Sequence, residues 1–245
     1  MVKLKRRCSA ASTDSWDDGR KRPLSAIRRR GIADAHFGNV LAEFHSRCVR
    51  YSSGEHVTSV VATEMQTQRR DFSTTKVLLG QSRLPDVIDR LKASRLIEMM
   101  EERTAAEAFR CSMVARGNGG LIRDVHGDLH IENWWLMNGE IAIPDVMPYD
   151  RYRIVDVLRD VARVTLELAT FGSRDLASRF VRRYLECHPQ AQCESLFDYF
   201  ILRLAVADLA RHLKAYASGS VRYSKTRLGA WNLREQLLLD AVNRL

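Results

Sequence analysis

The clearest strand-like stretch of this chain lies near its middle, between two long regions of helical pattern, and it limits the folds that the chain can adopt. The helical pattern before it is ended by Gly117-Asn118-Gly119-Gly120, because glycine and asparagine favour turns. Residues 121–125 are β-like, and Asn138-Gly139 joins two apolar runs, residues 134–137 and 140–143. An Asn-Gly pair between apolar runs is a strong hairpin signal. The sequence therefore predicts an α+β, mainly helical fold with a central β-hairpin.

Apolar residues at helical spacing predict helices on both sides of this hairpin. One pattern begins near Ile32, and another begins after Pro85, a residue favoured in the first helical turn. Residues 51–81 have a less regular pattern, and we expect mostly loop there. The expected helices cover residues 32–48, 86–114, 157–170, 175–186, 195–217 and 230–245.

The first thirty residues differ in composition from the rest of the chain. Residues 1–30 are polar and basic and include the triplet Arg28-Arg29-Arg30. We expect a basic tail or hinge remnant over residues 1–30, with Val2-Lys3-Leu4 as the remnant of a strand, and one domain over residues 31–245. The net charge of +9 attracts anions such as nucleotides, phosphorylated metabolites or nucleic acid. A solvated flexible arm is the preferred interpretation of the tail, and a nucleic-acid-binding segment is the alternative.

Cysteine usage and hydropathy indicate the compartment. The five cysteines are scattered and never spaced C-x-x-C, which argues against a disulfide framework and a zinc ribbon. No apolar stretch approaches the roughly eighteen residues that a membrane span needs. The basic N-terminus is not followed by an apolar run, so it is not typical of a secretory signal. We expect a cytoplasmic protein without a membrane partner.

The kinase catalytic-loop pattern, H-x-D followed by four residues and Asn, matches His126-Gly127-Asp128-Leu129-His130-Ile131-Glu132-Asn133. This spacing lets Asp128 reach the hydroxyl of a phosphate acceptor while Asn133 turns back to a magnesium ion on the nucleotide phosphates. A second metal ligand is expected at the far end of the hairpin, where Asp145 follows an apolar strand. Carboxylate and amide oxygens are ligands that Mg²⁺ prefers. The sequence therefore predicts a phosphoryl-transfer site.

The same motif resembles the signature of the aminoglycoside phosphotransferase family, a branch of the protein-kinase-like fold. Residues 145–162, ending in Asp156-Val157-Leu158-Arg159-Asp160-Val161-Ala162, are similar to the segment that follows the metal-binding Asp in these enzymes. Leu41-Ala42-Glu43-Phe44-His45 is similar to the end of a helix that precedes the catalytic loop. The resemblance covers about residues 31–217 and is closest to uncharacterised bacterial members.

The resemblance implies a catalytic residue and two cofactors. Asp128 would be the catalytic base or the carboxylate that orients the acceptor. Asn133 and Asp145 would bind Mg²⁺ and, through it, ATP. The acceptor would be a small molecule with a free hydroxyl, and its identity is left open.

The resemblance also implies a set of residues that brace the site. His126 would hold the loop from behind, while Asp156 and Asp160 would anchor the loop and the following helix. Helix capping and surface pairing are the alternative for the two aspartates. Ligation of a transition metal by His126 and His130 is disfavoured, because the H-E-x-x-H order is missing. Trp134-Trp135 is expected to pack on the two faces of the hairpin.

The parts of a kinase that hold ATP are not found in the sequence. A glycine-rich loop and a strand Lys paired with a helix Glu normally hold the phosphates and precede the catalytic loop. Here residues 31–116 are mostly helical in pattern, and G-x-G-x-x-G does not occur. We expect a kinase-like C-terminal lobe without its N-terminal ATP-binding lobe. Three explanations stay open: a truncated product, a second chain that supplies the lobe, and a degenerate protein.

The leading interpretation is an enzyme that transfers the γ-phosphate of ATP to a small-molecule hydroxyl. A non-catalytic binding module with a degenerate kinase-like fold is the alternative, and nucleic-acid binding through the basic tail is a weaker one. Aminoglycosides are disfavoured as acceptors because these polycations would meet a basic chain. Local acids such as Glu101, Glu102 and Asp150 could offset that charge.

Overall fold

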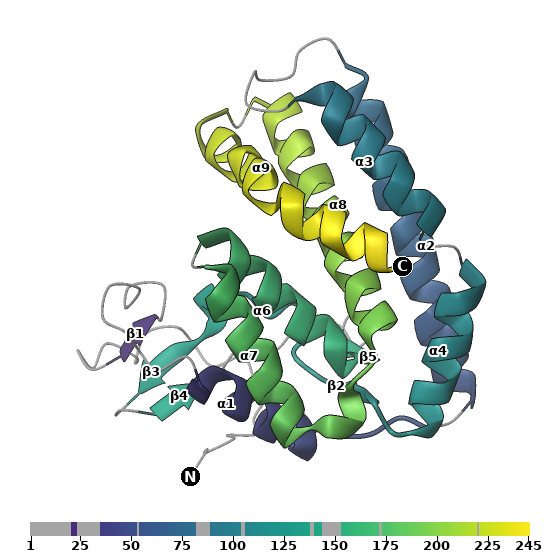
Figure 1. Cartoon of the computed structure of the whole chain (residues 1–245), viewed down its shortest axis with the longest axis vertical. Helices are drawn as coiled ribbons and strands as arrows, with labels where there is room; N and C mark the ends of the chain where they lie inside the picture. The colour runs from purple at the N-terminus through teal and green to yellow at the C-terminus, as the bar shows by residue number, and fades with distance from the viewer. Residues whose placement is uncertain are drawn as a thin grey trace.

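The computed structural model describes residues 21–23, 35–52, 54–81, 89–103, 106–137, 140–143, 153–171, 173–219 and 221–245. Helices dominate these residues, which confirms the prediction of a mainly helical α+β fold (Figure 1). The helices are α1 (Ala35–Arg47), α2 (Gly54–Leu79), α3 (Arg90–Arg103), α4 (Ala106–Asn118), α6 (Val157–Phe171), α7 (Arg174–Cys187), α8 (Glu194–Ala217) and α9 (Val221–Arg244). The strands are β1 (Lys21–Pro23), β2 (Ile122–Asp124), β3 (Trp135–Met137), β4 (Glu140–Ala142) and β5 (Ile154–Asp156), and two 3-10 turns are η3 (Ile131–Asn133) and η4 (Pro189–Ala191). In the part of the chain that is described, no helix combines the length and the apolar character that a membrane crossing requires.

The described strands form two small antiparallel sheets. In the first, β3 lies between β1 and β4, and Leu136 of β3 pairs with Ile141 of β4. This pairing confirms the predicted hairpin, whose Asn138-Gly139 turn lies outside the described residues. In the second sheet β2 pairs with β5, and Arg123 lies opposite Val155. The sequence predicted neither β5 nor β1, which comes from the segment interpreted as a tail.

Helix α8 is the centre of the helical packing (Figure 1). It packs against α2, α6 and α9. All of residues 198–206 are buried. A helix turns once in 3.6 residues, so this run means that the middle of α8 is covered on every side. The β1–β3–β4 sheet lies at one end of the molecule near α1, β5 of the second sheet contacts α4, and α3 contacts α9 toward the other end (Figure 1).

The prediction of loop over residues 51–81 is wrong, because α2 occupies Gly54–Leu79. Apolar side chains recur on the buried face of α2, but Glu64 and Asp71 occupy two of its buried positions. Their carboxylates lie 3.2 and 3.0 Å from guanidinium nitrogens of Arg203 on α8. Charged residues at core positions interrupted the apolar period on which the prediction depended.

Three further expectations differ from the structure in detail. The helical run over residues 86–114 is two helices, α3 and α4, and the last helix begins at Val221 rather than Ala230. Trp134 precedes β3 instead of lying in a strand. Its buried ring packs edge-on against Phe37 of α1, with ring centroids 5.2 Å apart. This contact attaches the start of the hairpin to α1.

Helix α1 lies directly on α7 at Gly38. A Cβ added to Gly38 would lie 2.7 Å from the backbone nitrogen of Tyr184 and 2.8 Å from the backbone oxygen of Phe180. Both neighbours are backbone atoms of α7, so a side chain at this position would push the helices apart. The close approach brings His45, near the end of α1, within 2.9 Å of the Tyr184 hydroxyl.

Candidate functional site

The catalytic-loop motif connects β2 to η3, and α6 holds its backbone from behind. Gly127 has φ +84°, in the left-handed region that favours glycine. Asp160, in the first turn of α6, accepts hydrogen bonds from the backbone N–H groups of His126 at 3.0 Å and Gly127 at 3.1 Å. The Asp160 side chain is buried, so water does not compete for these bonds. A carboxylate therefore fixes the backbone that leads into Asp128.

The His126 side chain contacts the same loop. Its Nδ1 accepts a hydrogen bond from the backbone N–H of Asp128 at 3.3 Å, and the ring is buried. Together with Asp160, this contact restrains the loop both before and at Asp128. It is the kind of contact that the bracing role of His126 requires.

His45 is a buried residue that the sequence analysis did not connect with the loop. Its Nε2 lies 3.5 Å from Oδ2 of Asp160, and its Nδ1 shares a hydrogen bond with the Tyr184 hydroxyl. Both rings are buried. His45 therefore ties Asp160, and through it the loop, to α1 and α7. The sequence signal for His45 is the resemblance of the Leu41–His45 segment to a helix end in the family, but that resemblance does not predict which residue His45 contacts.

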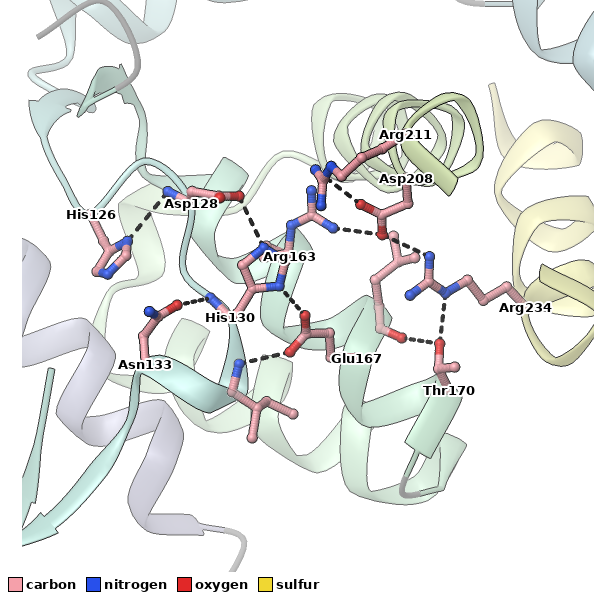
Figure 2. Close-up of polar contacts among 12 residues, drawn as sticks. His126, Asp128, His130, Asn133, Arg163, Glu167, Thr170, Asp208, Arg211 and Arg234 are labelled. Atoms are coloured by element: carbon pink, nitrogen blue, oxygen red, sulfur yellow. Dashed lines mark hydrogen bonds and ion pairs between the residues drawn. The ribbon is translucent and has the colours of Figure 1, made fainter. Parts of the chain in front are cut away.

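The side chain of Asp128 is 37% exposed and is paired with His130. His130 Nε2 lies 3.2 Å from Oδ1 of Asp128, and the other ring nitrogen contacts Glu167 of α6 (Figure 2). Glu167 also accepts a hydrogen bond from the backbone N–H of Ile131 at 2.7 Å. The imidazole thus links the carboxylate at the loop to a buried carboxylate on α6.

The charges of the Asp128–His130–Glu167 triad are set by neighbouring groups. Burial lowers the pKa of His130, but hydrogen bonds to Asp128 and Glu167 outweigh it and raise the pKa to about 9. Burial raises the pKa of Asp128, but His130, with help from Arg163 and Arg211, holds it well below its usual range. The pKa of Glu167 is lowered despite burial, chiefly by His130. At neutral pH the triad is therefore a cation between two anions.

Asn133, the predicted metal ligand of the loop, closes the η3 turn. Its Oδ1 accepts a hydrogen bond from the backbone N–H of His130 at 2.8 Å. An amide oxygen has a second lone pair, so it fits the oxygen chemistry that Mg²⁺ prefers. Asp145, the other predicted ligand, lies outside the described residues. Among the residues that are described, no group of three His, Cys, Asp or Glu side chains is placed to hold a metal ion.

Asp156, also predicted to brace the site, contacts a different element from Asp160. It is fully buried and binds Arg116 of α4, with 2.9 Å between Oδ1 and Nη2. Oδ1 also accepts a hydrogen bond from the backbone N–H of Leu158 at 2.8 Å, which caps the start of α6. Asp156 thus joins α4 to the β5–α6 junction.

A second ionic cluster lies next to the triad and joins α6, α8 and α9 (Figure 2). Oδ2 of Asp208 accepts hydrogen bonds from Arg163 and Arg234, each at 2.8 Å, and Arg211 lies 3.4 Å from Oδ1. Burial raises the pKa of Asp208, but the three arginines hold it well below its usual range. Arg234 also donates to Thr170 Oγ1 at 2.7 Å. No sequence pattern pointed to this cluster, because its members come from three separated helices.

Comparisons with known proteins give distant relatives. No protein-family profile matches the chain, and no solved structure matches it. The chain is 28% identical over 183 residues to the uncharacterized protein Rv2004c of Mycobacterium tuberculosis, and equally to the uncharacterized protein Mb2027c of Mycobacterium bovis. The matching region is 72% of this chain and 34% of each relative, so the chain spans about a third of the length of these curated relatives.

Proposed function

We propose that residues 31–245 form the catalytic lobe of a kinase-like phosphotransferase that transfers the γ-phosphate of ATP to a hydroxyl of a small molecule. The observation that carries the proposal is the partly exposed carboxylate of Asp128. The backbone before it is bound to the buried Asp160, and its charge is held by His130. Phosphoryl transfer depends mainly on positioning and electrostatics, which such a carboxylate provides. The resemblance of residues 126–133 to aminoglycoside phosphotransferases supports the same reaction.

In this proposal Asp128 orients the acceptor hydroxyl. A carboxylate whose pKa is well below its usual range is a weak base, so it accepts the hydrogen bond of the hydroxyl in the ground state. It takes the proton only as the new oxygen–phosphorus bond forms. Asp128 would therefore orient the hydroxyl first and act as a base only late in the reaction, which combines the two roles that the motif left open.

The cofactors of the proposal are ATP and Mg²⁺. Bound Mg-ATP supplies the phosphoryl group and neutralises part of its charge. Asn133 and Asp145 are the residues proposed to hold the metal. In the family that the motif resembles, a separate lobe covers the phosphates, and a second chain that brings such a lobe remains part of the proposal.

Thermal melts with and without millimolar Mg-ATP test the nucleotide site. A ligand at about 100 times its dissociation constant adds roughly 2.7 kcal/mol, and the melting temperature should rise by about 5–10 °C. Asp145→Ala should lose the rise, while Asp128→Asn should keep it and lose phosphate transfer from γ-labelled ATP. The matched control is Asp175→Asn, whose side chain is 71% exposed on α7. It should behave as the unaltered protein.

This experiment distinguishes the phosphotransferase from the alternative, a non-catalytic binding module with the same fold. A magnesium-dependent rise that disappears in Asp145→Ala supports the phosphotransferase. A wild-type melt that Mg-ATP leaves unchanged, with and without added candidate lobe-bearing partners, supports the non-catalytic binding module instead.

A further inference from the structure

Arg211 lies near the candidate catalytic loop, and within the described part of the chain it makes one long ion pair. Its side chain is 52% exposed on α8, and its ion pair with Asp208 is long, 3.4 Å between Nη2 and Oδ1. Toward the residues that the structure describes, Arg211 donates no hydrogen bond. A guanidinium carries five N–H donors in a planar fork that fits a phosphate or a carboxylate. Arg211 is therefore a cation with room for an anionic ligand.

Asp208 does not need Arg211 for charge compensation. Arg163 and Arg234 are both buried and both donate to Oδ2 of Asp208 at 2.8 Å. Three guanidinium groups surround one carboxylate, and the neighbouring Asp128–His130–Glu167 group has a net charge of −1, so one positive charge is left in excess. Arg211 is the member of the cluster that reaches solvent. The excess charge is therefore presented to solutes on the exposed side of α8.

Two of the three arginines around Asp208, namely Arg163 and Arg211, also act on Asp128. Burial raises the pKa of Asp128, and Arg163 and Arg211 are among the cations that outweigh it. Arg163 lies between Asp128 and Asp208 in the close-up, with the Arg211 guanidinium beside it (Figure 2). The Nε of Arg163 is buried and has no hydrogen-bond partner within the described residues. A ligand whose hydroxyl lies at Asp128 would meet a cationic surface at its other end.

We propose that Arg211, backed by Arg163, binds the anionic group of the acceptor, a small hydroxyl compound that carries a phosphate or a carboxylate. The hydroxyl lies at Asp128 and the anionic group at Arg211. Two cations beside Asp128 also repel polycationic acceptors. That the bound compound accepts phosphate rests on the proposed function, but anion binding at Arg211 does not depend on phosphate transfer.

Calorimetric titration of the full chain, without nucleotide and at low ionic strength, tests this site. The probes are glycerol 3-phosphate and glycerate, with glycerol as the neutral analogue. At least one anion should bind and glycerol should not. Arg211→Gln should weaken that binding about tenfold or more, because hydrogen bonds to charged groups are among the strong ones. Arg211→Lys should retain part of it, because the charge stays and the fork is lost.

Two further variants locate the bound anion. Arg183→Gln is the matched control, because Arg183 is 47% exposed and pairs with Glu186 at the same i,i+3 spacing as the Asp208–Arg211 pair. It should leave the affinity unchanged. Asp128→Asn should strengthen anion binding several-fold, since it removes a nearby negative charge. A weakly bound anion elsewhere on this basic chain would not respond to Asp128.

The outcomes separate this inference from the proposed function. If an anion binds in a way that depends on Arg211 but Mg-ATP does not change the melting temperature, the anion site is supported and the phosphotransferase is rejected. A protein that responds to Mg-ATP but binds neither anion, or binds one equally well after Arg211→Gln, overturns the anion site alone. Melting curves of each variant confirm that a lost affinity is not a lost fold.

Discussion

His130 lies between two carboxylates, Asp128 and Glu167, which raise its pKa and favour its protonated form at neutral pH. The imidazolium neutralises part of Asp128 and fixes its direction. Arg163 is the other cation that faces this group, and it opposes the proton on His130. The balance still raises the pKa of His130 to about 9. Stability and site geometry are therefore both coupled to this proton.

The pH dependence of stability tests the charge of His130. The folded pKa is about 9 and the ordinary value is 6.5, so the stabilisation is fully present below about pH 6.5 and is lost as the pH rises through 9. In His130→Gln the free energy of unfolding in urea should fall by on the order of 2–3 kcal/mol at pH 6. The difference from the wild type should shrink by pH 9.5.

A histidine elsewhere provides the control for this prediction. His56→Gln, at an exposed position of α2, should change the free energy of unfolding little at pH 6. His188 does not affect the comparison between pH 6.5 and 9.5. Burial and nearby cations lower its pKa to about 4, so its contribution to stability changes only below about pH 6.5. A difference between wild type and His130→Gln that stays constant from pH 6 to 9.5 would show that the imidazole is neutral in the folded protein.

At the residue scale, the sequence pattern predicted part of the candidate site. The H-x-D-x4-N spacing predicted Asp128 and Asn133 as site residues, because the proposed chemistry requires those side chains within one loop. His130 belongs to the same motif, yet its partner Glu167 follows 37 residues later on α6. Nothing in the spacing of a helix says which loop its carboxylate will meet.

At the scale of elements, the contact of α1 with α7 determines how the loop is held. The contact depends on Gly38, and it brings His45 to Tyr184 and to Asp160. The helices could not lie this close with any side chain at residue 38. The geometry behind residues 126–133 therefore depends on a glycine far from them in sequence.

Gly38→Ala should destabilise the protein by about 3 kcal/mol or more, at the upper end of overpacking, because the added methyl group meets backbone that cannot rotate away. Urea denaturation would measure the change. Gly54→Ala is the control: a Cβ there has nothing within 4 Å, and alanine is the better helix former. Its stability should be equal or slightly greater. Equal effects of the two substitutions would contradict the close approach of α1 and α7.

Whether an element could be predicted depended on its apolar period. The helices α6, α7 and α8 follow the predicted ranges within a few residues, since their apolar residues recur regularly. Helix α2 was missed because Glu64 and Asp71 occupy buried positions that normally carry apolar side chains. Those carboxylates are compatible with burial because Arg203 of α8 pairs with both, a compensation that a local pattern does not contain.

At the scale of the whole molecule, Asp208 connects three helices that are distant in sequence. It holds Arg163 of α6 and Arg234 of α9 against α8, the central helix. Both arginines are buried, so each depends on this carboxylate for compensation. The cluster therefore couples the C-terminal helix to the helix that carries Glu167 and Asp160.

Asp208→Asn should cost about 3–5 kcal/mol at pH 7, because it leaves buried arginines without their carboxylate. The pKa of Asp208 is lowered, so its contribution is present above its ordinary value of 3.8 and is lost as the pH falls. The difference from wild type, measured by urea unfolding, should be smaller at pH 3 than at pH 7. Asp175→Asn, at an exposed position, should differ little at either pH. A small effect of Asp208→Asn at pH 7 would contradict the coupling.

The sequence by itself determined the local features of this protein: the helices with regular apolar period, the hairpin, and the catalytic-loop motif. Each depends on residues within a few positions of one another. Only the tertiary structure decided which side chains surround that motif. Glu167 contacts the motif directly, His45 reaches it through Asp160, and Asp208 binds the arginines beside it; the three residues lie on different helices. Packing selects these pairs through burial and charge compensation across the whole chain, and no local pattern records that selection.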